Sequence, residues 1–241
     1  MKILGVDTST PVGSIGITDD ESVIAEYSLN VVETHSSRLM SAIDDLLRRA
    51  LLKIHDMDAF AIAIGPGSFT GLRIGLGTMK GFCYALKKPL VGVVTLDALA
   101  YNVKFADKLI CPILDARRGE VYAAVYRGSS DGRLELQTDY LCTKIELLLE
   151  TLAEPTIFLG DGFNRYKDTI AEMLKEKAIF TTPFFGFCRG ATVALLGYER
   201  LKAGESDDYF SITPFYIRKS EAEVRFEAGM LRTEPESPKP V

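Results

Sequence analysis

The order of apolar and amphipathic segments is repeated in the two halves of this chain. The first half carries strand-like segments at residues 3–6, 14–17, 23–27, 59–64 and 90–94, with helical periodicity at residues 37–53 and 71–87. The second half carries strand-like segments at residues 109–114, 121–126, 134–141 and 156–159, with helical periodicity from residue 145 and at residues 166–175 and 189–202. Two copies of one mixed order predict an α/β protein built from two stacked lobes.

Smaller signals refine this outline. Thr143-Lys144-Ile145-Glu146 has the pattern of a capping box, so we expect a helix to begin there with Thr143 as its cap. The tail beyond residue 219 has few aliphatic residues and no period, which predicts partial disorder.

Composition narrows the classes to which this protein can belong. Hydrophobic residues make up 47% and charged residues 25% of the sequence, values typical of soluble globular domains. The opening residues show no secretory signal, and no apolar run approaches the roughly 20 residues that span a bilayer. We therefore expect a cytoplasmic protein without a membrane partner. The net charge of −5 argues against a broad face that binds nucleic acid, although it leaves room for a local basic patch.

Cysteine and histidine offer little for metal binding or catalysis. The four cysteines lie far apart and form no Cys-x-x-Cys pair, which is typical of buried reduced thiols. The two histidines, His35 and His55, are too few for an ordinary zinc site or a Ser-His-Asp triad. A metallopeptidase is disfavoured on the same grounds, and we expect no metal site. His35, at the mouth of the first helix, is interpreted as structural.

The run Gly65-Pro66-Gly67-Ser68-Phe69-Thr70-Gly71-Leu72-Arg73 follows an apolar strand and precedes a helix. It lacks the lysine of a Gly-x4-Gly-Lys-Ser/Thr phosphate loop, and it does not fit Gly-x-Gly-x-x-Gly. The segment is therefore not one of the common nucleotide-binding loops.

The helix after this run contains an unusual number of glycines. Gly71, Gly75, Gly77 and Gly81 all lie within it, and each costs roughly 1 kcal/mol relative to alanine inside a helix. Gly77, Gly81 and Ala85 fall four residues apart and form a smooth ridge. Such a ridge allows another helix to come close, either the helix at residues 37–53 or a helix of a second subunit. Spacing alone does not decide between them.

Two aspartates occupy equivalent places in the two halves, each after a buried strand. Asp7 is followed by Thr8 and Ser9, and Asp115 begins a charged turn. A carboxylate in this position can hold a magnesium–phosphate group, and Gly160-Asp161-Gly162 after a later strand would let a nucleotide base approach the backbone. The alternative is that these aspartates only cap turns. Arg117 and Arg118 in the same turn either bind an anion or are solvated.

Several of these segments together resemble the bacterial TsaB (YeaZ) family. The similar segments are Asp7-Thr8-Ser9, His35-Ser36, the run from Gly65 to Gly75, Asp115-Ala116-Arg117-Arg118-Gly119-Glu120-Val121-Tyr122, and Pro214-Phe215-Tyr216-Ile217-Arg218. The resemblance covers about residues 1–218, and its glycine-rich segment is specific to this family and its relatives.

The resemblance implies a fold of the actin/Hsp70/sugar-kinase (ASKHA) type with two RNase-H-like lobes. We therefore expect an N-terminal lobe at residues 1–103 that carries the docking helices, and a C-terminal lobe at residues 104–218 whose last helix can pack back on the first lobe. Residues 219–241 form the tail.

The resemblance also implies a function. The family takes part in adding a threonylcarbamoyl group to adenosine 37 of tRNAs that read ANN codons, as a non-catalytic scaffold of the paralogous transferase subunit TsaD. TsaE, an ATPase, is the further partner, and tRNA is contacted indirectly through the complex. The His-x-x-x-His metal pair of TsaD has no counterpart around His35 or His55, as expected of a subunit that is not an enzyme. The chain alone can form a homodimer in this interpretation.

The resemblance assigns the glycine ridge to partner docking, in a four-helix bundle with TsaD or a second copy. The expected interface positions are Leu39, Ile43, Gly71, Leu72, Gly75, Leu76, Gly77, Met79, Gly81 and Phe82. No cofactor is required, although ATP or ADP with Mg²⁺ can occupy a remnant cleft or an interface of the complex. The expected remnant cleft comprises Asp7, Thr8, Ser9, Asp115, Gly160, Asp161 and Gly162. The alternative function is an ATP-dependent phosphotransferase or ATPase of the same fold.

Overall fold

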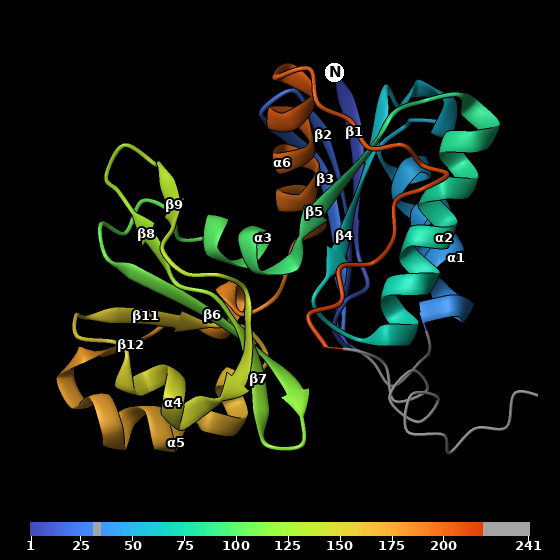
Figure 1. Ribbon diagram of the computed structural model, residues 1–241. Coiled ribbons are helices and arrows are strands. Elements are labelled where there is room, and N and C mark those ends of the chain that lie inside the picture. The colour runs from blue at the N-terminus through green and yellow to red at the C-terminus, as the bar shows by residue number, and fades with distance from the viewer. Residues whose placement is uncertain (31–34, 219–241) are drawn as a thin grey trace, which may run out of the picture.

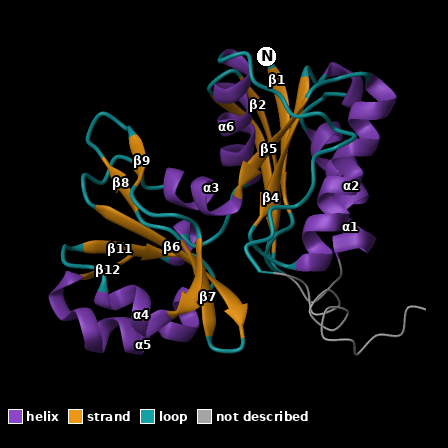
Figure 2. Ribbon diagram, viewed as in Figure 1, coloured by secondary structure: helices purple, strands orange, loops and turns teal. Residues whose placement is uncertain are grey.

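The structure is a computed structural model that describes residues 1–30 and 35–218. Its helices and strands form two lobes, each built around one β-sheet (Figures 1 and 2). The chain leaves the first lobe after α3 (Thr95–Tyr101) and returns to it through α6 (Gly190–Lys202), which packs on β1, β2, β4 and β5. The α/β, two-lobed architecture predicted from the repeated element order is confirmed.

The sheet of the first lobe has the strand order β3-β2-β1-β4-β5. Its strands are β1 (Lys2–Asp7), β2 (Gly13–Asp19), β3 (Ser22–Leu29), β4 (Ala59–Gly65) and β5 (Leu90–Val94). The β1–β2 and β2–β3 pairs are antiparallel, whereas β1–β4 and β4–β5 are parallel. Helices α1 (His35–Arg49) and α2 (Phe69–Leu86) cover one face and α6 covers the other, so the central strands are buried on both sides.

The sequence of β4 explains how the two faces differ. Because side chains alternate along a strand, Phe60 and Ile62 face the core under α1 and α2, and the alanines at 59, 61 and 63 face the core under α6. The small residues let α6 lie very close to the sheet. A Cβ added to Gly16 of β2 would come within 2.1 Å of the backbone nitrogen of Ala191.

The sheet of the second lobe has the order β10-β7-β6-β11-β12, which repeats the order of the first sheet. Its strands are β6 (Leu109–Arg117), β7 (Glu120–Ala123), β8 (Tyr126–Gly128), β9 (Leu134–Leu136), β10 (Leu141–Lys144), β11 (Thr156–Leu159) and β12 (Ala178–Phe180). β8 pairs with β6 and β9 beyond this path. Helices α4 (Ile145–Glu150) and α5 (Phe163–Leu174) pack under the sheet around a separate apolar core.

Short 3-10 turns complete the described elements at η1 (Ile54–Asp56), η2 (Lys175–Lys177) and η3 (Pro183–Phe185). No helix in residues 1–30 and 35–218 has both the length and the apolar character that crossing a membrane requires.

The segment after α6 runs back over the first lobe as an extended strap, orange-red in Figure 1. The backbone nitrogen of Asp207 donates to Leu90 O at 2.8 Å, and that of Phe215 donates to Ile64 O at 2.8 Å. At the end of the strap, Arg218 reaches the second lobe and donates to Glu120 Oε2 at 2.9 Å. The C-terminal part of residues 104–218 therefore packs largely on the first lobe.

Three local predictions in the second lobe are wrong. Residues 121–126 do not form one strand, because Val125 N donates to Thr138 Oγ1 at 3.0 Å instead of to a neighbouring strand. Residues 134–141 likewise divide into β9 and β10. The expected cap Thr143 lies within β10 opposite Val121, and α4 begins after Lys144 without a side-chain cap. The short elements α3 and β12 were not predicted.

Candidate functional site

The glycine-rich run leads from β4 into α2 and lies against the turn that follows β1. Ser68 N donates to Ser9 O at 2.6 Å, which joins the two segments. Ser68 is also the N-cap of α2, and its Oγ accepts from Gly71 N at 3.4 Å. Because Ser68 supplies this cap, the helix begins at Phe69, two residues before its predicted start.

Most of the large apolar side chains predicted to face a partner are buried inside the chain itself. Leu39, Ile43, Leu72, Leu76 and Met79 are each at most 5% exposed. All but Leu72 belong to the apolar core between the sheet and the α1–α2 layer. Phe82, also predicted, is half-buried and stacks on Phe60 with ring centroids 5.6 Å apart. The spacing of these five residues marks the core stripe of each helix, which leaves their side chains almost no surface to offer a partner.

Gly71 and Gly75, which were also predicted at the interface, face inward. Thr8 Oγ1 donates to Gly71 O at 2.8 Å, and a Cβ added to Gly75 would lie 2.3 Å from Thr8 Oγ1. These two glycines let the end of β1 pack directly on the backbone of α2.

Gly77 and Gly81 lie on the opposite face of α2, which is open to solvent. Apart from the backbone of α2 itself, an added Cβ at either position would meet no heavy atom of residues 1–30 and 35–218 within 4 Å. Tyr84 follows on the same face at helical spacing and is 58% exposed. Its ring makes an edge contact with the exposed ring of Phe210, with the two ring centroids 6.0 Å apart. Gly77 and Gly81 therefore do not pack on the helix predicted at residues 37–53. Of the two neighbours that the spacing allowed for the glycine ridge, the one inside the chain is excluded for these two glycines.

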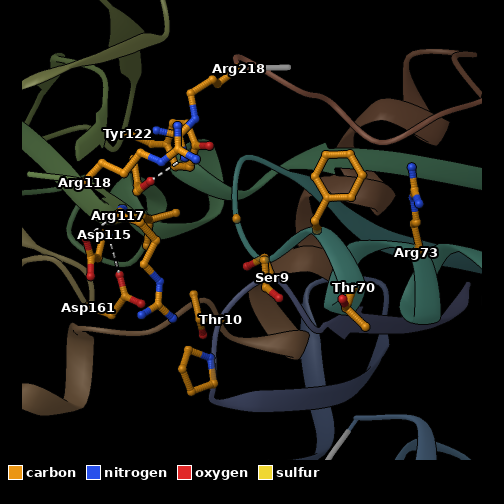
Figure 3. A pocket seen from close by; sticks show the side chains of 16 residues that line it. Ser9, Thr10, Thr70, Arg73, Asp115, Arg117, Arg118, Tyr122, Asp161 and Arg218 are labelled. Atoms are coloured by element: carbon orange, nitrogen blue, oxygen red, sulfur yellow. Dashed lines mark hydrogen bonds between the residues drawn. The ribbon is translucent and has the colours of Figure 1, made fainter. Parts of the chain in front are cut away.

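A cavity of about 560 Å³ lies between the lobes, where the glycine-rich run and the β6–β7 turn face each other (Figure 3). Its walls come from the turn after β1, the first turn of α2, the β6–β7 turn and the end of the strap. The lining residues that carry charge are Arg73, Asp115, Arg117, Arg118, Asp161 and Arg218.

Asp7 lies at the end of β1 but does not line this cavity. It is fully buried; its Oδ1 accepts from Ser9 N at 3.0 Å, and its Oδ2 has no hydrogen-bond partner among the described residues. Burial raises the pKa of Asp7 to about 7, and hydrogen bonds from Ser9 offset part of that rise.

Asp115 and Asp161 do line the cavity, and both are engaged by neighbouring groups. Asp115 Oδ2 pairs with Arg165 Nη1 at 3.2 Å, and its Oδ1 accepts from Arg117 N at 2.9 Å. Asp161 Oδ1 accepts from Asp115 N at 3.1 Å, and burial raises the pKa of Asp161.

The expected remnant cleft is thus only partly assembled at the cavity. Ser9, Asp115 and Asp161 line it, whereas Asp7, Thr8, Gly160 and Gly162 do not. Gly160 and Gly162 instead pack on β6, where an added Cβ would lie 2.2 Å and 3.0 Å from Ile113 O. His35 begins α1, but its side chain lies outside the described part of the chain.

Two arginines that line the cavity, Arg73 and Arg218, were not predicted as site residues from the sequence. Arg73 Nε donates to Tyr216 Oη at 3.1 Å, and its guanidinium lies 4.4 Å from the centroid of the Phe69 ring. Arg218 donates to Ala116 O at 2.8 Å as well as to Glu120. Both belong to segments that carry the family resemblance, yet their place in the cavity depends on contacts between distant segments, such as that of Arg73 with Tyr216, which lies 143 residues further along the chain.

Within the described ranges, no group of three or more His, Cys, Asp or Glu side chains is arranged to hold a metal ion.

Comparison with protein families and curated relatives gives concordant results. A family model described as TsaD, tRNA N6-adenosine threonylcarbamoyltransferase, matches residues 23–226. The chain is 35% identical to the tRNA threonylcarbamoyladenosine biosynthesis protein TsaB of Bacillus subtilis, over 94% of this chain and 98% of the relative. It is 31% identical to the TsaB protein of Escherichia coli, over 70% and 74% of the two chains.

Comparison with solved structures concerns the fold. YeaZ from Pseudomonas aeruginosa matches with a TM-score of 0.75 and 24% identity, over 90% of this chain and 99% of the other. Component A of (R)-2-hydroxyglutaryl-CoA dehydratase from Acidaminococcus fermentans matches with a TM-score of 0.52 and 12% identity, over 85% and 100%. The predicted ASKHA-type fold is confirmed by these likenesses.

Proposed function

Because the chain belongs to the TsaB family and takes part in the biosynthesis of threonylcarbamoyladenosine in tRNA, we propose that it is the non-catalytic subunit that binds and stabilises TsaD. In this role it holds the transferase in its active arrangement while the threonylcarbamoyl group passes to adenosine 37 of tRNAs that read ANN codons. TsaE joins the complex as a further partner, and the isolated chain forms a homodimer through the same surface.

The observation that carries the proposal is the outer face of α2. Gly77 and Gly81 lie inside a helix, where each lowers stability by roughly 1 kcal/mol relative to alanine. Neither approaches any other part of the described chain, so no internal packing offsets that loss. Contact with a helix of another protein supplies the compensating energy, because glycine lets two helix backbones come close.

The surroundings of these glycines support the same role. Tyr84 and Phe210 present exposed aromatic surface beside Gly81, and aromatic residues are enriched at the centres of protein interfaces. We therefore define the docking face as Gly77, Gly81, Tyr84 and Phe210. The buried residues of α1 and α2 support this face from below and do not belong to it.

The alternative, an ATP-dependent phosphotransferase or ATPase, is not favoured by the site. Asp7 is buried away from the cavity, and Asp115 is paired with Arg165. Gly160 and Gly162, expected beside a base, are packed on β6.

A reconstitution tests the proposal. The full chain is mixed with TsaD and TsaE of the same organism, with ATP and with threonylcarbamoyl-adenylate as the group donor. Threonylcarbamoyladenosine in a tRNA transcript is then quantified by mass spectrometry with and without the chain. We expect co-purification with TsaD, and modification that depends on the chain. Full modification by TsaD and TsaE alone, or no association with TsaD, would contradict the proposal.

A further inference from the structure

The cavity between the lobes is lined by more cationic than anionic side chains. Four arginines, Arg73, Arg117, Arg118 and Arg218, line it together with the two carboxylates of Asp115 and Asp161. Asp115 is paired with Arg165, and Asp161 accepts from the Asp115 amide and interacts electrostatically with Arg117. The four arginines still outnumber the two carboxylates, and this excess of positive charge around the cavity suits an anionic ligand.

The β6–β7 turn holds two of these arginines in an unfavourable backbone conformation. Arg117 and Arg118 have φ values of 66° and 55°, and Gly119 follows with 81°. The left-handed region is disfavoured for residues with a side chain, and hairpin turns of this shape prefer Asn, Asp or Gly. Strained residues of this kind cluster at binding sites. Figure 3 shows Arg117 pointing across the cavity toward Thr10.

The opposite wall also presents groups that suit an anion. Gly67, Ser68, Phe69 and Thr70, at the N-terminus of α2, line the cavity, and the first amides of a helix have no acceptors within it. The Ser68 and Gly71 amides already donate to Ser9 O and Ser68 Oγ, so the Phe69 and Thr70 amides, together with the helix dipole, are the groups that favour a negative charge at that end.

Ser9 supplies an independent observation on this wall. It is 1% exposed and lines the cavity; its Oγ lies close enough to the Asp7 carboxylate to lower the pKa of that group, but it makes no hydrogen bond of ordinary geometry within the described residues. A buried hydroxyl of this kind ordinarily has a partner, and a ligand oxygen in the cavity would provide one.

We propose that this cavity binds a phosphate group without a divalent cation, held between Arg117 and Arg118 on one side and the N-terminus of α2 with Ser9 on the other. Arg218, engaged by Glu120 and Ala116, closes the rim, and Arg73 is held by Tyr216.

Of the sources of a phosphate, the structure favours the RNA backbone over a free nucleotide. Arg117 and Arg118 are exposed at the mouth of the cavity, where a polynucleotide can reach them. The glycines expected beside a nucleotide base do not line it. The assignment to RNA rests on the proposed function, and it adds a direct contact between this subunit and tRNA.

Fluorescence anisotropy of the full chain with a labelled, unmodified tRNA transcript that reads an ANN codon, in EDTA, tests the proposal. We expect Arg117→Gln and Arg118→Gln each to weaken binding at least about fivefold, and each to lower the slope of log K against log salt by about 0.9. Arg133→Gln is the matched control: it removes the same charge from a side chain that is 75% exposed and paired with Asp131 on the β8–β9 turn. We expect it to bind like the unaltered chain.

Other outcomes of this experiment test the phosphate site and its assignment to RNA separately. Binding that needs Mg²⁺, binding that all three variants weaken equally, or binding that neither turn variant changes would overturn the phosphate site. ATP and AMP are also tested as competitors of tRNA binding in EDTA. If either displaces the tRNA at concentrations where inorganic phosphate does not, the assignment to RNA would be overturned. The turn variants are expected to co-purify with TsaD as the unaltered chain does, so failure of this inference is distinguishable from failure of the proposed function.

Discussion

Thr8 and Gly75 form the contact through which the end of β1 meets α2, since a Cβ on Gly75 would lie 2.3 Å from Thr8 Oγ1. Thr8 is fully buried, and its hydroxyl is held by Gly71 O at 2.8 Å. Two residues further along the helix, Gly77 faces open space. Neighbouring glycines of one helix therefore have opposite structural roles, the first in internal packing and the second on the outer surface.

Gly75→Ala is expected to destabilise the isolated chain. The added methyl group must displace Thr8 or shift α2 away from the sheet, and overpacking of this kind costs about 1–3 kcal/mol. Urea unfolding followed by circular dichroism measures the change. An unaltered urea midpoint would show that Thr8 gives way without cost and would refute the packing role.

Gly77→Ala and Gly81→Ala are expected to have the opposite effect. Each replaces a solvent-facing helical glycine, so the free energy of unfolding should rise by about 0.5–1 kcal/mol per substitution. The same urea experiment provides the measurement, and Gly75→Ala serves as its control. Loss of stability in either variant would mean that the glycine contacts part of the chain.

Arg117→Asn should stabilise the fold while removing a proposed phosphate ligand. Asparagine tolerates the left-handed backbone at this position better than arginine does, which should add about 0.5 kcal/mol to the free energy of unfolding. Thermal unfolding without tRNA reports this gain. A lower midpoint would indicate that the arginine side chain stabilises the turn, and the strain argument would then fail.

The buried Asp7 predicts how stability depends on pH. Its pKa is about 7 in the folded chain and 3.8 as an ordinary aspartate, so the folded state holds the proton more tightly. The contribution of this group to stability is therefore present in full below about pH 4 and is lost as the pH rises to about 7. At most this loss amounts to about 4 kcal/mol, from roughly 1.4 kcal/mol per pKa unit.

Asp7→Asn tests that assignment, because the amide does not titrate in this range. Urea midpoints measured from pH 4 to pH 8 should fall less steeply for the variant than for the unaltered chain. Parallel pH profiles would show that Asp7 is not the group responsible.

Much of the fold follows from the sequence because period and order are local signals. The strand at residues 90–94 was predicted with its observed bounds, and the repeated order predicted two lobes. Short elements such as α3 and β12 have too few residues to show a period. The break at Val125 depends on Thr138, which only the folded chain brings near.

The site was harder to predict for two reasons. Leu72, Leu76 and Met79 have the spacing of a core stripe, yet the glycine pattern led to their assignment to the partner face. The phase of the helix, which the structure supplies, separates the two faces. The arginine-lined cavity depends on contacts between distant segments, as when Arg73 meets Tyr216, and no local pattern encodes such a meeting.

The docking face on α2 is the surface proposed to bind TsaD. Gly77→Glu places a bulky charge at the centre of that face, and Leu147→Glu places the same charge on the exposed surface of α4, where Leu147 is 55% exposed. A charge buried in an interface without a partner costs several kcal/mol, and each 1.4 kcal/mol is about tenfold in Kd.

Isothermal titration of both variants and the unaltered chain into TsaD is the most direct measurement. We predict that Gly77→Glu weakens binding at least about tenfold while its own unfolding midpoint is not lowered, and that Leu147→Glu binds like the unaltered chain. Equal affinity of the Gly77→Glu variant and the unaltered chain for TsaD would show that TsaD does not bind at this face.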